Sequence, residues 1–222
     1  MLFNVGVVIV CAGKGKRLGQ DKAVIKLKGK PLFFCAYELF ENIKQIKQIV
    51  IVLRKEHFGE ARRLIKDKRV MFCEGGRERK DSVLNGVLAL DESINYVLIH
   101  DGARPFTPKN VILNIIKELR KFPAVVCAVK SKDTLKSISK GFATKTLDRN
   151  NIFLVQTPQG FKKDTIIKAY GKLKNRVKVF DDAGALELMK GKVKIVEGSF
   201  SNIKITYPED ILLAKAIFGS RE

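Results

Sequence analysis

A glycine-rich loop near the N-terminus carries the first residues that could do chemistry. It follows an apolar, β-branched run at residues 5–10, which predicts a buried strand. Gly13 and Gly15 allow backbone amides to approach a phosphate, and nearby cations would stabilise its charge. The basic residues in and after the loop are Lys14, Lys16, Arg17 and Lys22. Such a glycine turn can be purely structural, but the four cations favour a triphosphate-binding site.

The spacing of this loop excludes two common nucleotide-binding motifs. In a G-x-G-x-x-G motif that starts at Gly13, the last glycine would stand at the position of Leu18. The pattern G-x-x-x-x-G-K-[ST] occurs nowhere in the chain. The loop is therefore neither a dinucleotide fingerprint nor a P-loop.

A second candidate motif follows the apolar run at residues 96–100. Asp101, Gly102 and Arg104 come directly after this predicted strand. A carboxylate at a strand end, close to an arginine, is suited to holding Mg²⁺ or a sugar hydroxyl near phosphates. The alternative for Asp101 is a turn-forming role, and we expect His100 to be packed or hydrogen-bonded rather than catalytic.

Two further segments could contribute to the same site. Gly75 and Gly76 precede a predicted helix near Ser82, which on its own could be an ordinary turn and helix cap. Near the C-terminus, Lys204 lies in a predicted strand at residues 202–206, between two isoleucines, and should point away from them. A lysine in a buried sheet needs an anionic partner, and a substrate phosphate is one.

The elements that must position these residues alternate between apolar runs and amphipathic stretches. Predicted strands at residues 5–10, 49–53, 70–73, 96–100 and 124–129 alternate with predicted helices at 32–40, 58–65, 81–90 and 111–119. This order predicts an α/β fold: a three-layer α/β/α, Rossmann-like domain with a mostly parallel sheet. Ligands of such sheets bind beyond the carboxyl ends of the strands, where the candidate residues lie.

The alternation stops at a polar segment rich in Ser, Thr and Lys. Residues 131–153, with a glycine at Gly141, predict a protruding β-hairpin arm. Exposed strand edges need a partner, so we expect a homodimer formed through the arm. The α/β pattern resumes at Thr165 and ends with a helix from Pro208. We therefore expect one domain over residues 1–222 with one arm.

Composition narrows the functional classes. The chain has 222 residues, 45% of them hydrophobic, and a net charge of +20. We expect a cytoplasmic protein with free thiols, because no apolar run approaches about 20 residues and the four cysteines are far apart. The sequence argues against nucleic-acid binding, because the lysines are spread along the chain and no aromatic-basic RNA-binding signature occurs. A phosphate-rich substrate would also benefit from this charge.

Taken in order, the motifs resemble those of a known enzyme family over nearly the whole chain. The first loop is similar to the signature of the glycosyltransferase-A-like nucleotidyltransferases, and the full set resembles 2-C-methyl-D-erythritol 4-phosphate cytidylyltransferase. The matching segments are Ala12-Gly13-x-Gly15-x-Arg17 with Lys22, Gly75-Gly76-x-x-Arg79-x-x-Ser82, His100-Asp101-Gly102-Ala103-Arg104-Pro105, Asp133-Thr134, Asp148-Arg149-Asn150, Gln156-Thr157-Pro158-Gln159 and Asn202-Ile203-Lys204-Ile205-Thr206-x-Pro208-Glu209-Asp210.

The resemblance implies a Mg²⁺-dependent transfer of CMP from CTP to the 4-phosphate of methylerythritol, with release of pyrophosphate. It implies that Arg17 and Lys22 stabilise the charge that develops on the reacting phosphate. It further implies a substrate-binding set and a nucleotide-binding set. The substrate-binding residues are Arg149 and Lys204 on the acceptor phosphate, Asp101 and Arg104 on the acceptor or the metal, and Thr134 and Thr157 in the acceptor pocket. The nucleotide-binding residues are Ala12, Gly13, Gly15, Gly76, Arg79, Ser82 and Gly102.

The chain departs from the family pattern at three places. Asp21 stands where the family usually has a proline before the lysine, Arg77 where an aspartate lies near the base, and residues 180–184 differ from the usual motif. Two alternatives stay open: a ribitol 5-phosphate cytidylyltransferase, which shares most of the motifs, and a non-catalytic basic module that binds RNA.

Overall fold

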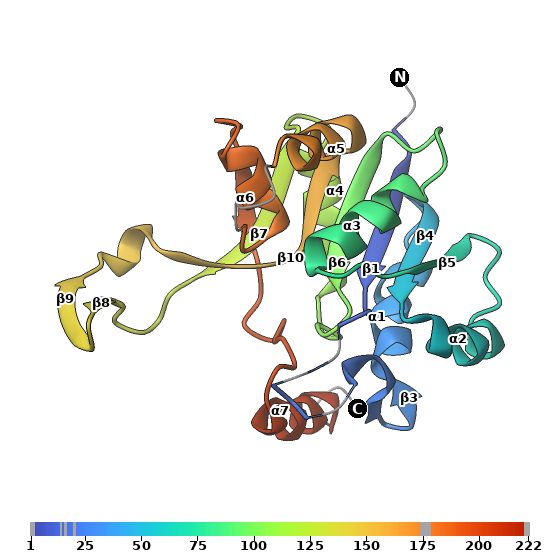
Figure 1. The fold of residues 1–222 in the computed structure, drawn as a ribbon, viewed down its shortest axis with the longest axis horizontal. Helices are drawn as coiled ribbons and strands as arrows, with labels where there is room; N and C mark the ends of the chain where they lie inside the picture. Colours follow the sequence, from blue (N-terminus) through green and yellow to red (C-terminus); the bar gives the residue numbers. More distant parts are fainter. Residues whose placement is uncertain (1–2, 14, 16, 20, 174–178, 220–222) are drawn as a thin grey trace.

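The computed structural model contains a seven-stranded sheet that confirms the predicted α/β class (Figure 1). The structure describes residues 3–13, 15, 17–19, 21–173 and 179–219. The strand order is β11-β7-β10-β6-β1-β4-β5, and only β10 runs antiparallel to its neighbours. The strands of this sheet are β1 (Val5–Val10), β4 (Ile46–Leu53), β5 (Val70–Glu74), β6 (Tyr96–Asp101), β7 (Ala124–Lys130), β10 (Phe153–Lys162) and β11 (Lys194–Glu197).

Helices cover both faces of the sheet and form the outer layers. Alternate residues of β1 divide between two cores: Val7 and Ile9 face one helical layer, and Val8 faces the other. The first layer consists of α1 (Leu32–Glu41), α2 (Phe58–Leu64) and α4 (Lys109–Glu118). The second consists of α3 (Arg79–Leu88), α5 (Lys163–Lys172) and α6 (Asp182–Glu187). Apolar β-branched strands buried on both faces therefore explain the layered architecture.

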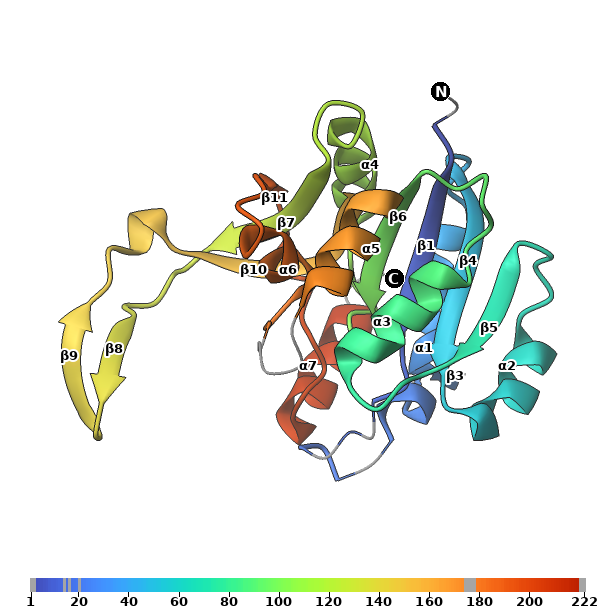
Figure 2. The same cartoon turned by 45° about the horizontal axis from the view of Figure 1, so that its top comes forward.

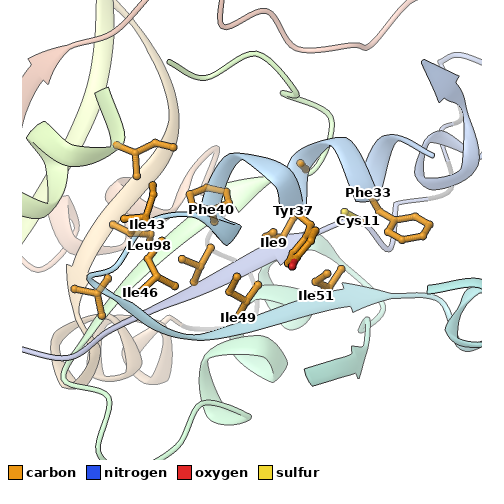
Figure 3. Packing of buried hydrophobic residues seen from close by; sticks show 14 of the residues in the cluster. Ile9, Cys11, Phe33, Tyr37, Phe40, Ile43, Ile46, Ile49, Ile51 and Leu98 are labelled. Carbon is orange, nitrogen blue, oxygen red and sulfur yellow. The ribbon is translucent and has the colours of Figure 1, made fainter. Parts of the chain in front are cut away.

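The core beneath α1 shows how this packing is built (Figure 3). Phe33 and Phe40 of α1 are fully buried against Ile9, Ile49 and Ile51 of the sheet. Burying each such side chain contributes about 1.5–3 kcal/mol relative to leaving it exposed. The predicted helix at 32–40 forms because its apolar face has this sheet surface to cover.

The carboxyl ends of four strands meet at one edge. Val10 of β1 pairs with Val52 of β4 and with Asp101 of β6, and Leu53 pairs with Glu74 of β5. Backbone hydrogen bonds continue past the strands, for example from Gly102 N to Val10 O at 3.0 Å. The loops that begin at residues 11, 54, 75 and 102 are therefore held side by side.

The predicted arm is present as a hairpin of β8 (Lys136–Ser139) and β9 (Phe142–Thr146), followed by the 3₁₀ turn η3 (Arg149–Asn151). It projects away from the sheet in both views (Figures 1 and 2). Its large apolar side chains are exposed, with Phe142 at 77% and Ile138 at 70% relative exposure. Such exposure agrees with a segment that packs against something outside this chain.

A small satellite core lies at the carboxyl edge of the sheet. It joins α7 (Pro208–Gly219) to the segment that carries η1 (Lys22–Val24) and the short strands β2 (Lys26–Leu27) and β3 (Lys30–Pro31). Leu27, Phe106 and Ile205 are nearly fully buried there. The first loop and the C-terminal helix therefore form one structural unit.

The predicted strand at residues 202–206 is wrong: these residues, all of which the structure describes, form no strand. Their polar groups bond to side chains and loops instead. Asn202, fully buried, donates to Thr157 O at 2.9 Å and accepts from Thr107 Oγ1 at 2.9 Å. Only Ile205 N makes a backbone bond across to the sheet side, to Ala103 O. Among the described helices, none is long and apolar enough to cross a membrane.

Candidate active site

A pocket of about 530 Å³ opens at the carboxyl edge of the sheet. Its size is typical of small-molecule sites. Loops after β1, β5 and β6 and the extended segment before α7 supply its walls. The candidate residues that line it are Ala12, Gly13, Gly15, Arg17, Lys22, Gly76, Arg79, Ser82, Asp101, Gly102 and Lys204. The structure thus brings together eleven of the residues predicted from separate motifs.

Close backbone approach shapes the wall of the pocket. Gly15 has a φ of +63°, a left-handed conformation that glycine adopts without strain. A Cβ on Gly75 would lie 2.2 Å from Ala12 Cβ, so only glycine allows the two loops to touch here. Ser82 Oγ accepts a hydrogen bond from Gly76 N at 3.0 Å and holds the second loop to α3. Lys14 and Lys16, two of the loop's predicted cations, lie outside the described residues.

Lys22 enters the pocket from the 3₁₀ helix η1. Its Nζ donates to Ile205 O at 2.8 Å, which links the first loop to the segment before α7. Burial lowers the pKa of Lys22, and the charges of Arg17 and Lys204 lower it further. Arg17 lies with its guanidinium 5.7 Å from the ring centroid of Tyr207, within range of a cation–π contact. Three cations therefore lie close enough to act on one anionic ligand.

Asp101 is the carboxylate at the centre of the site. Lys204 Nζ donates to its Oδ2 at 2.5 Å, and Arg79 donates to its Oδ1 at 3.0 and 3.1 Å. Burial alone would raise the pKa of Asp101, but the charges of Arg79 and Lys204 outweigh it and lower the pKa well below its usual range. Lys204 points to Asp101 and away from its flanking isoleucines, as expected, although the segment is not a strand.

Arg79 lies behind Asp101 and is shared between two carboxylates. Its Nη1 and Nη2 each donate to Asp182 at 2.8 Å, and Tyr170 Oη also donates to Asp182 at 2.5 Å. Asp182, at the start of α6, is fully buried, and burying it requires such partners. The only sequence signal for it is the pair Asp181-Asp182 within the 180–184 motif, which the sequence analysis treats only as a departure from the family pattern.

His100, near the end of β6, belongs to a buried hydrogen-bonded cluster next to Asp101. His100 Nε2 lies 3.0 Å from Arg104 O, which can only accept, so this nitrogen carries the proton. Nδ1 then accepts from Thr157 Oγ1 at 3.2 Å, and the same oxygen accepts from Asp101 N. His100 is fully buried with its ring edge-on to Phe40, as expected for a packed histidine.

Four predicted substrate-binding residues do not line the pocket of this chain. Thr157 is buried beneath Asp101, and Arg104 donates to Asn202 O at 2.7 Å. Thr134 and Arg149 lie on the arm, where both are exposed, and Arg149 donates to Lys132 O. These arm residues could reach a pocket only if it belonged to another chain, and their roles stay predictions.

The donor set of the pocket suits Mg²⁺ only together with substrate. Its carboxylates, among the described residues, are Asp101 and Glu78. Mg²⁺ commonly binds through one or two carboxylates plus substrate phosphates. The residues present fit such an ion only when a substrate phosphate draws Lys204 away from Oδ2 of Asp101, which would then be the buried ligand.

Sequence reasoning missed a second group of residues next to the pocket. Asp21 accepts hydrogen bonds from Arg54 and His57, beyond the end of β4. It was noted only as a departure at the position before Lys22. Arg77 and Glu78 also line the pocket, next to predicted Gly76 and Arg79.

The chain is similar to known proteins over almost its whole length. The family model described as "IspD: 2-C-methyl-D-erythritol 4-phosphate cytidylyltransferase" matches residues 5–220. The chain is 41% identical over 219 residues to the 2-C-methyl-D-erythritol 4-phosphate cytidylyltransferase of Clostridium novyi, covering 95% of this chain and 94% of that protein. Its relative of the same name from Bacillus mycoides is 36% identical over 217 residues, covering 95% and 96%.

Among solved structures, the 4-diphosphocytidyl-2C-methyl-D-erythritol synthase of Anaerococcus prevotii matches with a TM-score of 0.90 at 34% identity. The match covers 98% of this chain and 96% of that one, so it includes the arm as well as the sheet. The family match, the relatives and the solved structure therefore agree over almost the full length. The chain belongs to the IspD family of 2-C-methyl-D-erythritol 4-phosphate cytidylyltransferases.

Proposed function

We propose that this chain transfers CMP from CTP to 2-C-methyl-D-erythritol 4-phosphate, with the cations around the pocket as its main catalytic groups. The observation that carries this mechanism is the convergence of Arg17, Lys22 and Lys204 around one pocket beside Asp101. Phosphoryl-transfer chemistry asks little of a protein except positioning and charge stabilisation, and fixed cations supply both.

The reaction needs one bond to form and one to break. An oxygen of the acceptor's phosphate attacks the α-phosphorus of CTP, and the bond from that phosphorus to the bridging oxygen breaks to release pyrophosphate. Lys22 and Arg17 stabilise the negative charge on the α-phosphate oxygens. Lys204 holds the acceptor phosphate and orients it for attack.

The contacts of two lysines define what a substrate must replace. Lys22 Nζ is bonded to Ile205 O, and Lys204 Nζ is bonded to Asp101. A bound phosphate is a stronger acceptor for an ammonium group than a backbone carbonyl, so it would draw Lys22 from Ile205. Both contacts lie on the same short segment, so nucleotide and acceptor would meet at one place.

The nucleotide would lie against the two glycine loops. Ala12, Gly13, Gly76 and Ser82 frame the cytosine, where the close approach of the two loops leaves little room for a purine. A Mg²⁺ ion bound by Asp101 and the substrate phosphates would neutralise part of the triphosphate charge.

The arm would complete the site of a second copy of the chain. Its exposed Ile138 and Phe142 would be buried by dimer formation. Arg149 and Thr134, which lie outside the pocket of their own chain, would then contact the acceptor in the other chain's pocket. A cytoplasmic location agrees with four cysteines that are all free thiols.

The direct test is pyrophosphate release by the purified protein with Mg²⁺ and CTP. Methylerythritol 4-phosphate and ribitol 5-phosphate are supplied in parallel, and UTP replaces CTP in a further arm. We expect release with methylerythritol phosphate and CTP. Faster turnover of ribitol phosphate would refute the acceptor assignment. No release with any acceptor, together with salt-sensitive RNA binding, would refute the enzymatic function.

A further inference from the structure

Asp21 forms the centre of a polar cluster next to the pocket that the mechanism above does not use. Its Oδ2 accepts from Arg54 Nη2 and lies 2.5 Å from His57 Nε2. Its Oδ1 accepts from Ala23 N at 3.0 Å and so caps η1, the turn that carries Lys22. One carboxylate therefore bonds both the turn and the segment that follows β4.

The partners of Asp21 follow a buried inner strand of the sheet. Arg54 follows directly on β4, which is buried over residues 49–53 and hydrogen-bonded to β1 and β5. His57 ends η2 (Lys55–His57) and immediately precedes α2. Through these contacts Asp21 connects the turn at Lys22 to the edge of the sheet, so the position of the turn does not depend on the loop alone.

The surroundings of η1 show why such an anchor is useful. Lys22 is drawn away from solvent and lies near two other cations, Arg17 and Lys204, which repel it. Its neighbour Ala23 is buried, whereas the side chain of Lys22 turns to Ile205 O. Asp210 and Asp101 offset this repulsion only in part, so a fixed turn would help to keep Lys22 beside the other cations.

We propose that Asp21 is a positioning residue, which with Arg54 and His57 holds η1 so that Lys22 projects into the pocket. This inference rests on the proposed catalytic role of Lys22.

A metal site is the alternative use of the same cluster. Ligand atoms of Asp21, Glu56 and His57 lie within 4.8 Å of one another. The guanidinium of Arg54, however, bonds the same Asp21 oxygen that faces His57, and also bonds Glu56 at 2.8 Å. A metal cation bound here would have to displace the guanidinium of Arg54 from Asp21. The geometry therefore favours the positioning role of Asp21 over a metal site.

The chain offers a matched control in Asp67. Asp67 also accepts hydrogen bonds from the side chain of a nearby arginine, Arg69, and from a backbone N–H two residues ahead, which is Arg69 N. Its side chain is 16% exposed, compared with 13% for Asp21. It lies before β5 and bonds Tyr37, away from the pocket lining. Asp67→Asn therefore removes a comparable ion pair without touching η1.

The test compares kcat and KM for Asp21→Asn, Arg54→Gln and their double variant, with Asp67→Asn alongside. Asparagine keeps an acceptor for Ala23 N, so only the bond to Arg54 and His57 is weakened. We expect kcat to fall about 10- to 100-fold in each cluster variant while KM for CTP changes less than about threefold. The double variant should lose no more than the worse single variant, because both break the same contact. Arg54→Lys, which keeps the charge, should recover part of the loss.

Three results would overturn the inference. The first is a kcat for Asp21→Asn within about twofold of Asp67→Asn. The second is additive losses in the double variant. The third is an equal loss of thermal stability and of kcat in Asp67→Asn and in the cluster variants, which would show that destabilisation alone accounts for the loss of kcat. An inactive wild-type protein would overturn the proposed function and this inference together, whereas an active wild type with unaffected cluster variants would overturn the inference alone.

Discussion

His100 should make the folded protein sensitive to mild acid. Burial lowers the pKa of His100 from 6.5 to about 4, and its bond to Arg104 O does not compensate. Between these pH values the unfolded chain binds a proton that the folded chain does not, so stability falls as pH falls. At about 1.4 kcal/mol per pH unit, the full effect is about 3 kcal/mol, of which about 2 kcal/mol is lost by pH 5.

The assay is urea unfolding of the wild type and of His100→Gln at pH 7.5, 6 and 5. At pH 7.5 the variant should be the less stable protein, because it loses packing against Phe40 and the bond to Thr157. By pH 5 the difference between their free energies of unfolding should narrow by about 2 kcal/mol, because only the wild type carries the cost of protonating this histidine. His57→Gln, which removes the other histidine, is the control. If the free energies of unfolding of the wild type and of His100→Gln change by the same amount from pH 7.5 to 5, burial does not hold His100 neutral and the reasoning fails.

Three further changes test the substrate assignments and the packing of the pocket. Lys204→Ala should raise KM for the acceptor about tenfold with little change for CTP, and a change confined to CTP in steady-state kinetics would contradict its role. Replacing arm residues 132–151 by a short turn should give a poorly active monomer by light scattering, and a fully active monomer would disprove a shared site. Gly75→Ala should destabilise the protein by about 1–3 kcal/mol and weaken CTP binding, because its Cβ would collide with Ala12. Gly59→Ala, on an exposed helical position with open space around it, is the control and should be neutral or stabilising in thermal unfolding.

The parts of the fold that follow from the sequence are those in which local pattern and burial agree. The strands at residues 5–10 and 124–130 were predictable because continuous β-branched runs suit strands buried on both faces. The arm was predictable for the opposite reason, since its polar residues cannot form a core layer. In both cases composition alone limits where the segment can lie.

The antiparallel strand β10 was not predicted, although it lies inside the sheet between β7 and β6. Gln156, Thr157 and Gln159 are buried within it, and polar residues hide the apolar pattern of a strand. They are tolerated because distant groups satisfy them: Gln156 donates to Ser199 O, and Gln159 accepts from Ala183 N. Such bonds join residues far apart in sequence, so no local pattern announces them.

For the site, too, the sequence predicts which residues lie at the edge of the sheet but not which of them pair with one another. Motif spacing brought Lys22, Asp101 and Lys204 to one edge, because each follows or faces a strand end. It could not say that Lys204 would pair with Asp101, or that Asp182 would take the other side of Arg79. These pairings depend on how α6 and the segment before α7 fold back on the sheet.

The charge balance of the pocket explains why a buried carboxylate belongs in a site for anions. Five cationic residues line the described pocket against the two carboxylates of Glu78 and Asp101, a surplus of three that falls to two when Asp182 behind Arg79 is included. Charges on the outer surface are screened beyond about 8–10 Å, so on the proposed function this local surplus would bind the phosphates, whereas the +20 of the whole chain would mainly attract them. Like charges as close as Lys22 and Lys204 repel each other, and Asp101 offsets that repulsion until substrate arrives. In the proposed reaction an entering phosphate would take over the role of Asp101 for Lys204. The same cations would then have an anionic partner both before and after substrate binds.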